Sequence, residues 1–157
     1  MQLIEDIKNT FTNIQINLFD LKDQKSKDFW FFLKDQKYKG IYLFFNKCNE
    51  DVSDIIYVGK AGRYENNKRT VYDRTQNYFY NRKFYPNSPL NSEGKFEFKK
   101  LNRLYKQHEL IFEKDYFKMI TILIKEDKTI SPELLESFVL NKLLKEYNHY
   151  PKFNNKI

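Results

Sequence analysis

The chain has 157 residues, of which 41% are hydrophobic and 18% aromatic, so it is long enough to bury a core as one domain and too apolar to be disordered. Its single cysteine, Cys48, excludes a disulfide framework, a zinc ribbon and a zinc finger, and it is typical of a reducing compartment. We therefore expect a cytoplasmic protein. No apolar run exceeds five residues, which is too short for a membrane span.

The net charge of +7 is concentrated in the middle third of the chain. Twelve Lys or Arg and only five Asp or Glu lie between residues 54 and 107, whereas the other residues carry sixteen of each. Such a stretch forms either a solvated lysine-rich face or a surface that binds a polyanion. The Tyr and Phe residues interleaved with these cations favour the second reading, because nucleic-acid bases stack on aromatic rings.

The first 38 residues predict helices. Apolar residues recur at spacings of three or four from residue 3 to residue 21, and a dense apolar group at 29–33 predicts a second helix over 26–35. We expect this N-terminal helical extension to cover one face or edge of a sheet. The alternative is an arm that contacts a second subunit or DNA.

The middle of the chain alternates strand and helix patterns. Strands are predicted at 40–46, 54–60 and 115–125, where β-branched and aromatic residues are dense. Helices are predicted at 68–81, which contains Arg74, and at 96–110. The stretch 82–95 holds two prolines and a glycine and reads as a loop.

The last helix has clear boundaries. Ser131 is a good N-cap and Pro132 suits the first helical position, and the pattern continues to about Tyr147. On a helical wheel Glu136 falls near the centre of an apolar arc. A carboxylate there requires compensation, so Glu136 is either one half of a buried ion pair or a metal ligand or catalytic group.

Two tripeptides surround a polar loop in the centre of the sequence: Gly40-Ile41-Tyr42, and Tyr57-Val58-Gly59 followed by Lys60. With fifteen residues from Tyr to Tyr, this arrangement resembles the GIY-YIG nuclease family. Three later segments resemble the family in the expected order. These are the helix with Arg74, the segment Leu134-Leu135-Glu136-Ser137 and the tail Tyr150-Pro151-Lys152-Phe153-Asn154.

The resemblance implies an α+β fold, with a small three-stranded antiparallel sheet flanked by helices. The strands predicted at 40–46, 54–60 and 115–125 supply three strands independently. The domain would then cover residues 39–157, with a basic insertion at about 82–114 and the N-terminal helical extension at 1–38.

The resemblance also implies roles for individual residues. Arg74 would contact the scissile phosphate, and Glu136 would bind one Mg²⁺ or Mn²⁺ per active site. Tyr42 would position or deprotonate the attacking water, if a cation such as Lys60 or the metal lowered its pKa. Tyr57 would hydrogen-bond that water or a phosphate oxygen, and Asn154 would anchor the tail. The site expected from the resemblance is therefore Tyr42, Tyr57, Lys60, Arg74, Glu136 and Asn154.

From these features we expect a metal-dependent DNA endonuclease of the restriction type, acting on double-stranded DNA. Basic residues of the insertion would contact the DNA: Lys95, Lys99, Lys100, Arg103 and Lys106. A double-strand cut would need a homodimer or two successive visits. The alternatives are a nicking or structure-specific nuclease of repair or of mobile elements, and a catalytically silent nucleic-acid-binding module. Some restriction enzymes of the family have a His where this chain has Tyr78, so the identity of the general base stays open.

Overall fold

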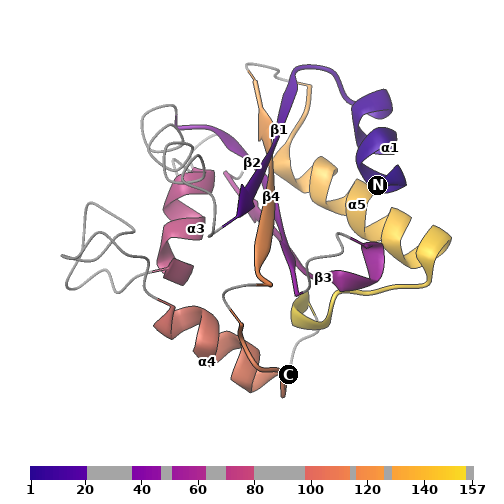
Figure 1. Ribbon diagram of the computed structural model, residues 1–157. Helices are drawn as coiled ribbons and strands as arrows, with labels where there is room; N and C mark the ends of the chain where they lie inside the picture. The colour runs from indigo at the N-terminus through magenta and orange to yellow at the C-terminus, as the bar shows by residue number, and fades with distance from the viewer. Residues whose placement is uncertain are drawn as a thin grey trace.

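A four-stranded antiparallel sheet forms the centre of the molecule (Figure 1). The computed structural model describes residues 1–20, 37–46, 51–62, 70–79, 98–113, 116–125 and 129–154. The strands are β1 (Ile14–Asp20), β2 (Lys39–Phe45), β3 (Ile55–Ala61) and β4 (Lys118–Ile124), in the order β1-β4-β2-β3. Strand β2 is therefore internal, and β3 is an edge strand.

Helices cover both faces of the sheet (Figure 1). α1 (Gln2–Thr10) and α5 (Pro132–Tyr147) lie on one side, and α3 (Val71–Phe79) and α4 (Lys99–Gln107) lie on the other. Two short 3-10 turns are also present. η1 (Val52–Asp54) immediately precedes β3, and η2 (Lys152–Asn154) ends the described part of the chain.

The core has two layers because side chains alternate along each strand. Ile41, Leu43 and Phe45 of β2 pack with the buried side chains of α1 and α5. Tyr42 and Phe44 of the same strand pack with those of α3 and α4. The central strand is buried on both sides, which explains why its sequence is a continuous apolar run rather than an alternating one.

The expected helix over residues 3–21 is wrong in its second half. α1 ends at Thr10, Asn13 adopts a left-handed φ of 55°, and the chain then continues as β1. Strand β1 pairs with β4 from Ile14 opposite Ile124 to Asp20 opposite Lys118. Residues spaced by four also satisfy the two-residue period of a strand, and this long-range pairing decided between the two.

The expected three-stranded sheet is therefore wrong in strand number. The three predicted strands are adjacent in the sheet as β3, β2 and β4, and β1 adds a fourth beside β4. The α+β class is confirmed, as are the helices around residues 68–81, 96–110 and 131–147. The helix predicted at 26–35 and the loop predicted at 82–95 lie outside the described residues.

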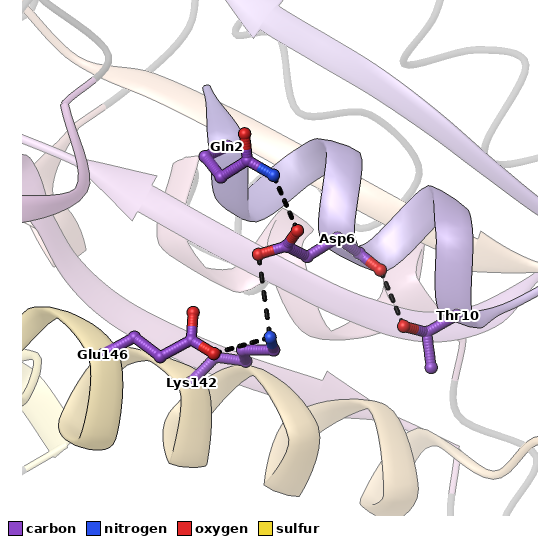
Figure 2. Close-up of polar contacts among 5 residues, drawn as sticks. All are labelled: Gln2, Asp6, Thr10, Lys142 and Glu146. Carbon is purple, nitrogen blue, oxygen red and sulfur yellow. Dashed lines mark hydrogen bonds and ion pairs between the residues drawn. The ribbon is translucent and has the colours of Figure 1, made fainter.

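Polar contacts fasten α1 to α5 (Figure 2). Lys142 of α5 lies 3.7 Å from the carboxylate of Asp6 and 2.7 Å from that of Glu146. Asp6 also accepts hydrogen bonds from Gln2 and Thr10, through its side chain and its backbone carbonyl respectively. Leu3 and Ile7, both fully buried, lie in the same interface layer, so α1 shares the core of the sheet.

α5 begins as the sequence predicts. The Ser131 hydroxyl accepts a hydrogen bond from the backbone N–H of Leu134 at 3.1 Å, and Pro132 is the first helical residue. At the other end Asn148 adopts the left-handed conformation and stops the helix. None of the described helices is long and apolar enough to cross a membrane.

Candidate active site

Tyr42 and Tyr57 lie side by side on β2 and β3. Tyr42 pairs with Gly59, and Phe44 pairs with Tyr57, so both phenols point to the face that α3 covers. Their ring centroids are 5.9 Å apart. Gly59 is required here, because a Cβ at this position would lie 2.3 Å from Cζ of Tyr42. The two tripeptides thus meet across one strand pair, with the Tyr42 ring lying on Gly59.

α3 brings a guanidinium and a third phenol to these two tyrosines. Thr70 precedes the helix, and reciprocal hydrogen bonds with Asp73, of 3.0 and 3.2 Å, fix its first turn. Arg74 and Tyr78 are one turn apart on this helix and share a face. The Tyr78 ring lies 6.2 Å from that of Tyr42 and 6.4 Å from that of Tyr57.

Arg74 carries a buried donor without a partner. Its Nε atom is shielded from solvent and makes no hydrogen bond in the structure. The positive charge of Arg74 favours the ionised form of Tyr42, so the two groups are within electrostatic reach. An unsatisfied buried donor of a charged group is unfavourable unless a further group, such as an anionic ligand, completes it.

Burial holds the phenols in their protonated form. It is the largest cause that raises the pKa of Tyr42 well above 10, and Tyr78 and Tyr57 add to the rise. Burial likewise raises the pKa of Tyr57, with smaller contributions from Tyr78 and from the charge of Glu136. The expected lowering of the Tyr42 pKa by Lys60 is therefore not found. Tyr42 is only 2% exposed, and desolvation of the phenolate outweighs the attraction of Arg74.

Glu136 and Lys60 form an ion pair on the α5 side of the edge strand β3. Lys60 Nζ lies 3.4 Å from Oε1 of Glu136, and the two side chains are 29% and 21% exposed. Lys60 pairs with Ile41, so it points to the face that α5 covers, opposite to the face of Tyr57. The effect of Glu136 on the pKa of Tyr57 shows that the carboxylate lies within electrostatic reach of this phenol.

The wheel position of Glu136 needs correction. The buried stripe of α5 consists of Leu135, Val139 and Leu143, and Glu136 lies at its margin rather than at its centre. Leu144, expected in the apolar arc, is 50% exposed. The α5 helix faces the core with a narrower stripe than the sequence suggests. One of the two roles expected for Glu136, the ion pair, is present in its contact with Lys60.

The donor set around Glu136 fits a hard cation with few protein ligands. Among the described residues no cluster of three or more His, Cys, Asp or Glu side chains is placed to hold a metal. Mg²⁺ is commonly held by one or two carboxylates, keeps several waters and takes further oxygens from a phosphate substrate. Zinc requires a nearly complete shell of protein ligands, which the described residues around Glu136 do not supply.

Asn154 binds the edge of the sheet at the back of Tyr57. Its side-chain oxygen accepts from the backbone N–H of Val58, and its side-chain nitrogen donates to the Val58 carbonyl, both at 2.8 Å. The side chain thereby occupies the hydrogen-bonding groups that β3 would otherwise present to solvent. The tail is joined to the strand that carries Tyr57, and Asn154 itself binds only backbone.

Part of the expected DNA-contacting set lies on one exposed face of α4. Lys100, Arg103 and Lys106 are exposed and spaced by three residues. Lys100 Nζ lies 5.4 Å from the centroid of the Tyr78 ring, which connects this face to the tyrosine group. Lys99 is the first residue of α4, and Lys95 lies outside the described residues.

The structure divides the predicted site between the two faces of the edge strand β3. Tyr42, Tyr57 and Arg74 gather under α3, whereas Lys60 and Glu136 approach from the α5 side of the edge strand. Tyr78 received no role from the sequence, although its spacing of four from Arg74 predicts a shared helix face. Comparisons of the chain with protein-family models, with curated proteins and with solved structures found no match.

Proposed function

We propose that this protein is a metal-dependent DNA endonuclease that hydrolyses phosphodiester bonds, with its active site at the edge strand β3. The proposal combines the sequence resemblance to GIY-YIG nucleases with the side chains gathered around Tyr57.

One observation carries the proposal: the buried, unpaired Nε of Arg74 beside three clustered phenols. A guanidinium is planar, permanently charged and presents parallel donors that match non-bridging phosphate oxygens. The phenols of Tyr42 and Tyr57, kept protonated by burial, are hydrogen-bond donors. A concentration of donors and one fixed positive charge is suited to an anion with several oxygen acceptors.

The residues divide the proposed work as follows. Arg74 neutralises the phosphate, and Tyr57 donates a hydrogen bond to a phosphate oxygen or to the attacking water. Tyr42, more deeply buried, orients Tyr57 and Tyr78. Glu136 holds the cation, which when bound supplies an acidified water and neutralises developing charge. Lys60 orients the Glu136 carboxylate through its ion pair.

The raised pKa values argue against a phenolate as the general base. Deprotonating a phenol whose pKa lies above 10 at neutral pH is unfavourable by more than 4 kcal/mol, at about 1.4 kcal/mol per unit. We therefore assign Tyr42 and Tyr57 to positioning the water and the phosphate rather than to removing a proton.

The test is incubation of the purified chain with supercoiled plasmid and with phage DNA, with Mg²⁺ or with EDTA. Discrete linear fragments that require Mg²⁺ support a restriction-type enzyme. Because one active site per chain cuts one strand, a double-strand cut implies a homodimer or two successive cleavage events. Nicked circles without linear product support the nicking alternative. If the protein binds the DNA but does not cleave it in Mg²⁺ or Mn²⁺, the result would contradict the proposal and favour a catalytically silent nucleic-acid-binding module.

Glu136→Gln is the decisive variant in this assay. It keeps the size of the side chain and removes the charge that holds the cation, so cleavage is expected to stop. Glu133→Gln is the matched control, because Glu133 lies one turn earlier on the same helix. Undiminished Mg²⁺-dependent cleavage by Glu136→Gln would refute the assignment of the metal ligand.

A further inference from the structure

Tyr57 lies directly after an irregularity in the edge strand. Phe44 pairs with Tyr57, but Phe45 pairs with Ile55, so Ile56 is an extra residue in β3. Such a β-bulge changes the direction of the side chains around it and weakens the local ladder. Among the described residues no strand pairs with the other edge of β3, so no second ladder restrains the bulge. The orientation of Tyr57 therefore needs a second restraint.

The C-terminal segment 148–154 makes contacts on both sides of Tyr57. The His149 ring places Nε2 2.7 Å from the carbonyl oxygen of Ile55, two residues before Tyr57. Asn154 makes its two hydrogen bonds to Val58, one residue after it. These contacts lie on the open edge of β3, opposite to the β2 ladder. They bracket the bulge and the phenol that follows it.

Segment 148–154 is itself held at both ends by contacts with the rest of the protein. At its start, the backbone N–H of His149 donates to the carbonyl of Leu143, which closes the C-terminus of α5. At its end, Phe153 is only 7% exposed. Its ring stacks on His108 at 4.4 Å and meets Tyr105 edge-on at 5.0 Å. A segment fixed in this way can restrain the strand against which it lies.

We propose that residues 148–154 form a clamp on the bulged edge strand that sets the orientation of Tyr57, and that His149 is a positioning residue in this clamp. The catalytic consequence rests on the proposed nuclease function, whereas the effect on Tyr57 does not. The tautomer that donates from Nε2 satisfies the Ile55 carbonyl at 2.7 Å. Neither the family resemblance nor the sequence patterns assign a role to His149.

The direct test observes Tyr57 itself. Incorporation of 3-fluorotyrosine at position 57 gives a single fluorine resonance that reports the surroundings of this ring. His149→Leu removes the donor to Ile55, and His149→Gln replaces it with an amide N–H of similar reach. Tyr150→Ala is the matched control, because Tyr150 directly follows His149 and the residue is 42% exposed.

The clamp predicts a shifted or broadened Tyr57 resonance in His149→Leu, recovery in His149→Gln and no change in Tyr150→Ala. An unchanged resonance in folded His149→Leu overturns the proposal. If His149→Leu does not fold, Asn154→Asp takes its place. It keeps the acceptor for the Val58 N–H and removes the donor to the Val58 carbonyl, so the same shift is expected and its absence is equally decisive.

Cleavage kinetics separate positioning from mere stability. Under single-turnover conditions His149→Leu should cleave roughly ten- to a hundredfold more slowly, because a misplaced group loses its orientation, with unchanged affinity for DNA. His149→Gln should restore most of the rate. Normal cleavage by His149→Leu with a displaced Tyr57 would overturn the catalytic part of the proposal. If the wild-type chain cleaves no DNA, the nuclease proposal fails, and the fluorine resonance still decides whether the clamp exists.

Discussion

The charged side chain of Arg74 lies where it does not contribute favourably to the stability of the folded protein. Its Nε is buried and unpaired, so replacing the side chain by one of similar volume removes an unsatisfied donor. Arg74→Met is expected to abolish cleavage and to raise the free energy of unfolding by about 1 kcal/mol. Urea denaturation and the plasmid assay measure the two effects. Arg103→Met, at an exposed position of α4, should change neither stability nor chemistry by as much. A loss of stability in Arg74→Met would contradict this account.

The Tyr42 ring can occupy its position only because residue 59 is a glycine and has no Cβ. Gly59→Ala puts a Cβ 2.3 Å from that ring, so the ring must move. We expect a loss of about 1–3 kcal/mol in unfolding free energy, as for other overpacked sites, together with reduced cleavage. A double-mutant cycle with Tyr42→Ala identifies the cause, because the alanine at 59 should be tolerated far better once the ring is gone. Equal effects in both backgrounds would exclude the clash.

The phenols also make a prediction about pH. The folded-state pKa values of Tyr42 and Tyr57 are raised above the ordinary value of 10. Their contribution to stability is therefore fully present below pH 10 and is lost as the pH rises toward the folded values, because the unfolded chain ionises first. Unfolding free energy measured from pH 8 upward should fall above pH 10. The fall should be shallower in the Tyr42→Phe, Tyr57→Phe double variant, and identical slopes would contradict the burial effect.

At the scale of single elements, α4 connects the basic surface to the candidate active site. Lys100, Arg103 and Lys106 share its exposed face, and Lys100 also lies over the Tyr78 ring. We expect that a single substitution of any of these three residues by Gln lowers the slope of log Kd for DNA against log salt concentration by about one, if the residue contacts a phosphate. Lys145→Gln, exposed on α5 across the sheet, is the control and should leave the slope unchanged. Equal slopes for all four variants would place the DNA elsewhere.

At the scale of the whole molecule, the N-terminal segment belongs to the same core as the candidate active site. Leu3, Ile7 and Phe19 are fully buried, and β1 forms one edge of the sheet. Each such side chain contributes about 1.5–3 kcal/mol, against a total stability of about 5–15 kcal/mol. A chain that lacks residues 1–20 should therefore show no cooperative thermal unfolding by circular dichroism. A cooperative transition with native-like amide resonances would mean that residues 1–20 are dispensable.

Local patterns in the sequence were sufficient for much of this architecture. The N-cap at Ser131 and the strands that became β2, β3 and β4 depend on neighbours in the chain, so short-range rules predict them. The strands predicted at 40–46 and 54–60 also pair with each other, as strands joined by a short connection commonly do.

Only the tertiary structure decided where the more distant groups meet. Residues 14–20 became a strand because β4, about a hundred residues away, offered a pairing edge that no local period encodes. The direction of the Tyr42 pKa shift came from burial under α3, and the pairing of Lys60 with Glu136 came from their common side of β3. Periodicity records what each residue is next to in the chain, whereas desolvation and charge pairing depend on what is next to it in space.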